Sequence, residues 1–297
     1  TLALFILLII YFFPNNDTII KEHLNYIKRD EMPIFLIDNS NYVARTSIVK
    51  SSKNINEQIK EIIETLTKNS KKSSYIRDGF NPIIPQNTKV IDVLLDNEIL
   101  TINFSKELLN IDKDNEEKMI EAIIYSLTEI KEIKKIKILV ENNPLTKLPN
   151  SQKKLPDYLD KNYGINKIYN LDSIKESTKT TIYYLSKFQD YHYFVPVTKI
   201  NNEKTEKVEI IIKELKSTPI YQTNLISYLA ASANITNYEL LENGIKLSFN
   251  NYLIANIKEE EALEEVKYSI ALSLRDTYGI NEVIFSIPNN ENTKINV

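Results

Sequence analysis

The feature that most constrains the fold is an internal repeat, in which one ordered set of hydrophobic patterns occurs twice. The clearest pair is a helix pattern: apolar residues recur at i, i+3, i+4 and i+7 in 59–66 and again, with the same spacing, in 208–215. A stripe of this period predicts an amphipathic helix with one buried face. The offset between matching positions is 143 to 149 residues, and six elements keep their order, so we infer a duplicated unit.

Strand patterns and a second helix complete each copy. Each unit opens with two strands, 33–37 and 42–49 in the first copy, 181–185 and 193–200 in the second. After the first helix comes a hairpin with period-two alternation, which predicts strands with one buried side. The remaining matches are the turns Asp96-Asn97 and Glu242-Asn243-Gly244, the strands Leu100, Ile102, Phe104 and Ile245, Leu247, Phe249, the helix faces Ile120, Ile123, Leu127 and Leu263, Val266, Ile270, the pairs Tyr125-Ser126 and Tyr268-Ser269, and the closing strands Ile136, Ile138, Val140 and Val283, Phe285, Ile287.

This order predicts an α+β fold made of two tandem β-β-α-β-β-α-β modules, each a mixed or antiparallel sheet with helices on one face. The predicted domains are 33–144 and 180–297. The segment 145–179 between them is rich in charge and contains Pro149, Pro156 and Gly164. We expect it to be a semi-ordered linker, part of which (156–171) folds onto a neighbouring unit.

The first residues of the sequence are strongly apolar. Leu2 to Phe13 form an uninterrupted hydrophobic run that Pro14 ends. Twelve residues span about 18 Å of helix, short of the ~30 Å hydrocarbon core, which fits either a signal-peptide segment or the end of a truncated membrane helix. The interpretation we favour is an uncleaved membrane anchor over 1–14 with the bulk of the chain extracytoplasmic; a buried N-terminal strand or helix is the alternative.

Composition excludes several classes of function. The 37 basic and 40 acidic residues nearly cancel, so the electrostatic signature of a nucleic-acid-binding protein is missing. The sequence contains no cysteine, which excludes disulfides, thiolate metal sites, cysteine nucleophiles and a thioether-linked lipid. It contains four glycines and no Gly-rich phosphate loop. We therefore expect no cofactor and no metal.

No set of residues predicts catalysis. The two histidines, His23 and His192, lie far apart in sequence, and His192 is expected to be a solvent-facing hairpin residue. Ser105 follows a strand and precedes a helix, so we expect an N-cap rather than a nucleophile. The acidic clusters Glu116-Glu117 and 259–261 fall in the first turn of predicted helices, where negative charge offsets the helix dipole. A glycosidase would need two such acids across a cleft.

Tyrosine is the other enriched residue, with 18 in the chain. Tyrosine packs well on strands and is also frequent at interfaces. A tyrosine patch of the second unit that contacts a partner or a glycan is therefore one hypothesis; its members would come from Tyr183, Tyr184, Tyr191, Tyr193, Tyr221, Tyr228 and Tyr238.

The first unit resembles the GerMN domain over 33–143. The resemblance is carried by the loop 77–90 (RDGFNPIIPQNTKV), the strand end 100–105 (LTINFS, with Asn103 where the family usually has Asp) and the helix segment 122–129 (AIIYSLTE). The second unit, 181–289, keeps Phe194-Val195-Pro196-Val197, similar to the family's second strand, but lacks the Ile-Pro loop and has Asn250 in place of the strand-ending Ser.

The resemblance implies an extracytoplasmic module similar to ring-building motifs, without catalytic activity, that assembles or recruits envelope proteins during spore formation. The partners we expect are envelope or sporulation proteins, further copies of the chain, and the membrane through the N-terminal segment. A peptidoglycan- or polysaccharide-binding module is the alternative, and a cell-wall hydrolase is the least favoured hypothesis. Family members of this kind resemble lipoproteins, so a chain without cysteine departs from them and would depend on its apolar N-terminus.

Overall fold

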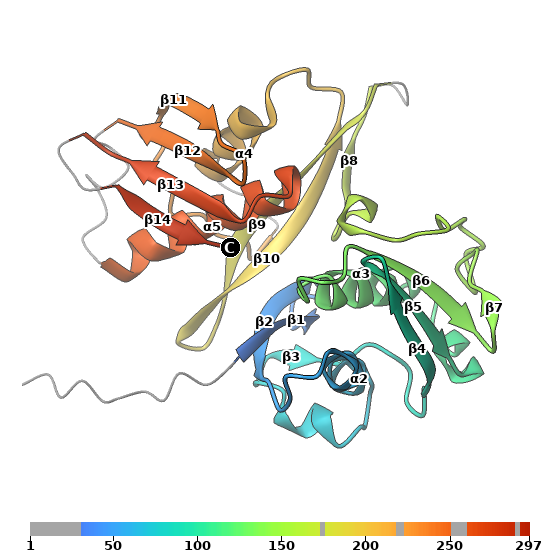
Figure 1. Cartoon of the computed structure of the whole chain (residues 1–297). Coiled ribbons are helices and arrows are strands. Elements are labelled where there is room, and N and C mark those ends of the chain that lie inside the picture. Colours follow the sequence, from blue (N-terminus) through green and yellow to red (C-terminus); the bar gives the residue numbers. More distant parts are fainter. Residues whose placement is uncertain (1–30, 173–175, 218–222, 251–259, 289–291) are drawn as a thin grey trace, which may run out of the picture.

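A computed structural model describes residues 31–172, 176–217, 223–250, 260–288 and 292–297 (Figure 1). In this part of the chain the strands form one six-stranded sheet and two four-stranded sheets. The four-stranded sheets have the orders β4-β5-β6-β7 and β11-β12-β13-β14, one in each predicted unit. The six-stranded sheet contains strands of both units. The duplicated element order is thus confirmed, and one sheet joins the two copies.

The first unit follows the predicted order. Its helices α2 and α3 come after the hairpins β1-β2 and β4-β5 respectively, and β6 lies parallel to β5. The face of α2 formed by Ile59, Ile62, Ile63 and Leu66 is buried, as predicted. The elements are β1 (Glu31–Asp38), β2 (Val43–Val49), α2 (Ile55–Leu66), η1 (Lys72–Tyr75), β3 (Phe80–Asn81), β4 (Val90–Asp96), β5 (Ile99–Phe104), η2 (Lys106–Leu109), α3 (Glu116–Leu127), β6 (Lys135–Val140) and β7 (Asn143–Pro144).

The second unit repeats this topology, with β13 parallel to β12 as β6 is to β5. Its elements, preceded by η3 (Lys161–Tyr163) and β8 (Ile168–Asn170), are β9 (Thr178–Phe188), β10 (Tyr191–Asn201), α4 (Lys207–Lys216), β11 (Ile235–Leu240), β12 (Gly244–Phe249), α5 (Glu260–Tyr278), β13 (Glu282–Ser286) and β14 (Thr293–Asn296).

The layering of each unit differs from the prediction of one sheet with helices on one face. The opening hairpin of each unit does not join that unit's four-stranded sheet. The helix α5 contacts β9 on one side and β13 and β14 on another, and α3 is buried almost all round. A helix that is buried all round lies inside the structure. Each unit therefore has its second helix between a hairpin and a four-stranded sheet (Figure 1).

A buried serine fixes each second helix to its opening hairpin. The backbone N–H of Phe35 in β1 donates to Ser126 Oγ of α3 at 2.9 Å, and that of Tyr183 in β9 donates to Ser273 Oγ of α5 at 2.8 Å. Ser126 is therefore equivalent to Ser273, and the predicted match of Ser126 with Ser269 is wrong by one helical turn. A shift of four residues leaves the buried face of a helix almost unchanged, so the hydrophobic pattern does not separate the two registers.

The segment 145–179 packs closely against both units. Leu148, Leu159 and Ile165 are buried, and β8 lies parallel to the end of β10. Glu116, in the first turn of α3 as predicted, accepts hydrogen bonds from the backbone N–H groups of Asn150 (2.7 Å) and Ser151 (2.9 Å). This buried carboxylate thus fixes the segment, a role beyond the predicted offset of the helix dipole.

The predicted anchor over 1–14 lies outside the described residues, and so do His23 and Tyr221. Among the helices that are described, none combines the length and the apolar character that a membrane crossing needs.

Candidate functional site: the interface between the two units

The six-stranded sheet crosses from one unit to the other between β2 and β10. These strands are antiparallel, and Arg45 pairs with Phe194. The hairpin registers make Arg45 equivalent to Pro196 and Phe194 equivalent to Val43, because Phe35 and Tyr183 occupy equivalent positions. The pair equivalent to Arg45–Phe194 is thus Val43–Pro196. The two units are related by an approximate two-fold axis between β2 and β10, the arrangement of a symmetric dimer within one chain.

The Val43–Pro196 pair is completed by the side chain of Asn166. Pro196 has no N–H to donate to the neighbouring strand. The amide of Asn166 fills the gap: its Oδ1 accepts from the N–H of Val43 (2.9 Å), and its Nδ2 donates to the carbonyls of Val43 (2.8 Å) and Pro196 (2.7 Å). The backbone N–H of Asn166 donates to Glu121 Oε2 at 2.9 Å. The segment between the units therefore contributes a side chain to the shared sheet.

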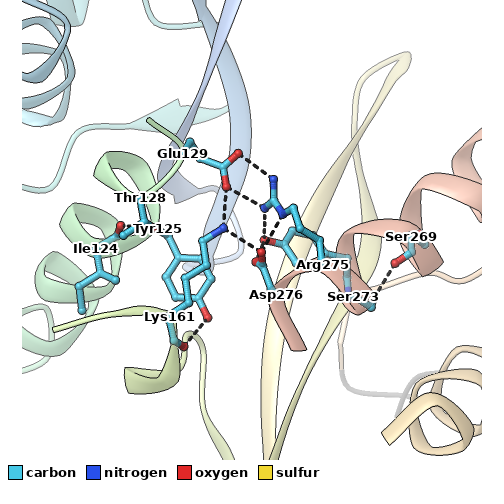
Figure 2. A network of polar contacts seen from close by, with 10 residues as sticks. Ile124, Tyr125, Thr128, Glu129, Lys161, Ser269, Ser273, Arg275 and Asp276 are labelled. Carbon is cyan, nitrogen blue, oxygen red and sulfur yellow. Dashed lines mark hydrogen bonds and ion pairs between the residues drawn. The ribbon is translucent and has the colours of Figure 1, made fainter. Parts of the chain in front are cut away.

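A buried network of four charges joins the ends of α3 and α5 (Figure 2). Arg275 makes a bidentate contact with Glu129, with nitrogen to oxygen distances of 2.9 and 2.7 Å, and its Nε donates to Asp276 at 2.8 Å. Lys161 bridges both carboxylates, at 2.8 Å from each. Glu129 and Asp276 each follow a paired serine by three residues, so they are equivalent acids across the two-fold axis. Two cations therefore balance two like charges that the symmetry brings together.

The protonation states of these groups depend on one another. Burial by itself raises the pKa of the Glu129 carboxyl, but the charges of Lys161 and Arg275 outweigh it and hold that pKa below its ordinary value. The pKa of Asp276 is lowered in the same way, against burial, by Arg275 and Lys161. Tyr183 donates its hydroxyl hydrogen bond to Asp276 Oδ2. Both carboxylates are therefore charged near neutral pH, and the interface is held by a closed ionic cluster.

The tip of the β9-β10 hairpin docks on the Gly79 loop of the first unit. The guanidinium of Arg77 lies 3.8 Å from the ring centroid of Tyr191, whose hydroxyl donates to the carbonyl of Asp78. Gly79 has φ +91°, and a Cβ built there would lie 2.8 Å from the ring of Phe188. Glycine is thus required both by the backbone angle and by the close approach. The loop on which the family resemblance depends is part of the interface between the units.

Two further aromatic contacts support this docking. The rings of Phe80 and Tyr193 meet edge to face with centroids 4.9 Å apart, and the hydroxyl of Tyr193 donates to Asp38 Oδ2 at 2.9 Å. Burial raises the pKa of Asp38, while hydrogen bonds from Tyr42 and Tyr193 act in the opposite direction. The interface therefore extends from the hairpin tip to the ion network.

The single residues considered in the sequence analysis mostly take part in hydrogen bonds and ion pairs within the fold. His192 lies in the β9-β10 hairpin, but it is half-buried rather than solvent-facing, with its Nδ1 2.6 Å from Glu265 Oε1 and its Nε2 3.2 Å from the hydroxyl of Tyr228. Ser105 precedes the short helix η2, but its side chain makes no capping bond there; it accepts from the N–H of Lys89 at 3.0 Å. Glu117 pairs with Lys153 at 2.7 Å. The side chains of 259–261 lie outside the described residues.

The tyrosines of our hypothesis that the structure describes, all but Tyr221, do not form an exposed patch. Tyr183, Tyr184 and Tyr193 are buried, and Tyr191 is half-buried against the first unit. Tyr238 is also half-buried, and Tyr228 is 37% exposed. Most of the described tyrosines of this set therefore pack between the units or within the core. Sequence reasoning missed the ion network, and the sequence signal for it was an acid three residues after each helix serine.

Within the described ranges, no three His, Asp or Glu side chains are grouped so as to hold a metal ion. The interface residues neutralise one another's charges and form hydrogen bonds with backbone groups. The fold and this interface define a class: a protein of two tandem α+β modules held together as an internal pseudo-dimer.

Comparison with known proteins agrees with this class. Residues 11–146 match the family "Germane: Sporulation and spore germination". The chain is 26% identical over 257 residues to the spore germination protein GerM of Bacillus subtilis, covering 84% of this chain and 69% of that protein. Its fold matches the solved tandem GerMN domains of the B. subtilis sporulation protein GerM with a TM-score of 0.78 and 23% identity, over 88% of this chain and 92% of that one. The N-terminal half of the chain therefore matches this family, and the chain as a whole has the fold of tandem GerMN domains.

Proposed function

We propose that this chain is an extracytoplasmic assembly protein of a spore-forming bacterial envelope, which recruits or stabilises a transenvelope sporulation complex through protein–protein contacts. The observation that carries the proposal is the locked interface: a buried ionic cluster and a shared sheet hold the two units as one body. A rigid body presents its outer surfaces in a fixed geometry, which suits assembly. The similarity to GerM, a spore germination protein by name, supports the cellular process.

The proposed contact surfaces are the outer strands β4 and β11. They occupy equivalent positions, and among the described strands each pairs on one side only, with β5 and β12 respectively. Large apolar side chains are exposed there: Ile91 (49%) and Leu94 (60%) on β4, and Leu240 (60%) on β11. An edge strand with free backbone groups accepts a strand from a partner. Further copies of the chain, added in this way, would give a larger assembly.

The proposal includes a membrane tether formed by 1–14, on the sequence argument alone. Catalysis is not part of it: the acids and the histidine that the structure describes are engaged in ion pairs or lie apart from one another. The chain would act by binding.

Site-specific photo-crosslinking in sporulating cells tests the proposal. A photoreactive amino acid at Leu94 or Leu240 should give crosslinks to envelope proteins or to the chain itself, whereas the same amino acid at the exposed Lys60 of α2 should not. Crosslinks from Lys60 alone, or none from β4 and β11 although the protein accumulates, would refute these contact surfaces. A fluorescent fusion should be enriched at the forespore membranes, and uniform labelling of vegetative cells would contradict the proposed role.

A further inference from the structure

A cavity of about 540 Å³ lies between the segment 153–163, β8 and the start of β9, and none of the four charged residues of the ion network lines it. Two tyrosines and two lysines on its wall are not used by the interface. We propose that this cavity binds a sugar that carries a carboxylate group, the chemistry of an acidic cell-wall glycan. The inference gives a definite ligand class to the polysaccharide-binding alternative and does not depend on the assembly role.

Aromatic surface is the first argument. Tyr158 and Tyr169 both line the cavity, and 47% and 58% of their surfaces are exposed. Most other tyrosines near the interface are buried, so these two rings are available to a ligand. The buried Leu159 and Ile200 line the same cavity. An apolar floor with exposed phenol rings suits the apolar face of a sugar ring, and the volume falls in the range of small-ligand sites.

Charge is the second argument, and it selects the kind of sugar. Lys153 and Lys167 also line the cavity, but both are paired with Glu117, at 2.7 and 2.6 Å. Lys154 and Lys179 remain; Lys179 donates one hydrogen bond, to the carbonyl of Asn162 at 3.0 Å. An ammonium group has three donors, so both side chains retain donors for a carboxylate.

A third observation disfavours phosphate. The carboxylate of Asp160 lines the same cavity, where it accepts from the N–H of Asn162 at 2.8 Å and keeps free lone pairs. A phosphate dianion would be repelled by this group, whereas sugar hydroxyls would donate to it. The combination of aromatic rings, two ammonium groups and one carboxylate therefore fits a monoanionic sugar better than a highly charged anion.

Calorimetric titration of the chain with two disaccharides tests this directly. One is N-acetylglucosaminyl-N-acetylmuramic acid, which has a lactyl carboxylate, and the other is N,N′-diacetylchitobiose, which is its neutral counterpart. We expect the acidic sugar to bind about tenfold more tightly, as one charge-assisted hydrogen bond predicts. Equal binding of the two sugars, tighter binding of inorganic phosphate, or no binding of the acidic sugar would overturn the inference.

Matched variants place the site. Lys154→Gln should reduce the preference for the acidic sugar, because only Lys179 then remains to bind the carboxylate, and Tyr169→Ala should weaken the binding of both sugars. The controls are Lys135→Gln on β6 and Tyr75→Ala on η1, where the tyrosine is 80% exposed and distant from the cavity. All four residues are exposed, so circular dichroism should show the same melting curve throughout. Binding that survives Tyr169→Ala, or falls equally with Tyr75→Ala, would contradict the site even if the crosslinking results hold.

Discussion

Replacing Arg275 by leucine should destabilise the chain more than any surface change. Its side chain is 14% exposed, and the carboxylates that it contacts belong to Glu129 (5% exposed) and Asp276 (1%). Without Arg275, Lys161 is the cation that remains in contact with the two buried carboxylates. Breaking a buried ion pair in this way typically costs about 3–5 kcal/mol. That range corresponds to a loss of two to nearly four orders of magnitude in the folding constant, and to a decrease in Tm of about 6–20 °C.

Urea unfolding at pH 7 measures this cost, and a second substitution identifies its origin. Adding Glu129→Gln to Arg275→Leu removes the uncompensated charge and leaves Lys161 paired with Asp276, so the double variant should recover more than half of the loss. Lys153→Gln is the control: its pair with Glu117 is 45% and 31% exposed, and such pairs contribute about 0–1 kcal/mol. An Arg275→Leu variant within 1 kcal/mol of wild type, or a double variant less stable than the single one, would refute the reasoning.

Three further predictions follow from the interface. The lowered pKa values of Glu129 and Asp276 mean that their stabilisation is complete above the unfolded carboxyl pKa values and is lost in acid; urea midpoints should be flat from pH 7 to about pH 5 and decrease below about pH 4. Asn166→Asp keeps the acceptor for Val43 but loses both donated bonds, so it should cost about 2–4 kcal/mol in denaturation, with faster amide exchange in β2. Gly79→Ala should cost more than Gly279→Ala in thermal melts, because both have positive φ but only Gly79 has a ring within 3 Å.

The hydrophobic pattern predicted the local elements well and the sheets poorly. Period-two and 3.6-residue repeats report which side of an element is buried, so the helix stripe from Ile59 to Leu66 and the strand from Leu100 to Phe104 agree with the structure. They do not report which strands meet. The opening hairpins look like members of each unit's own sheet, yet they join each other across the interface.

The interface itself depends on polar residues whose role is apparent only from the tertiary structure. Pro196 is unexpected within a strand of a sheet, and it is tolerated because Asn166, 30 residues away, supplies the missing bonds. Nothing in the pattern around Asn166 predicts that partner. The serines of α3 and α5 were visible in the sequence, but helical periodicity allowed a match one turn away from the correct one. Interface residues become predictable only when the pairing of the two units is known.

The central claim is that the two units form one rigid body through the β2–β10 junction and the ion network. Because the native chain has no cysteine, single cysteines at Lys60 of α2 and Glu209 of α4, both exposed, can carry spin labels without competing thiols. Pulsed electron–electron double resonance at pH 7 should give one narrow distribution of distances between the two labels, as narrow as for two labels placed within one unit. A broad or multimodal distribution would show that the units move independently and would contradict the account.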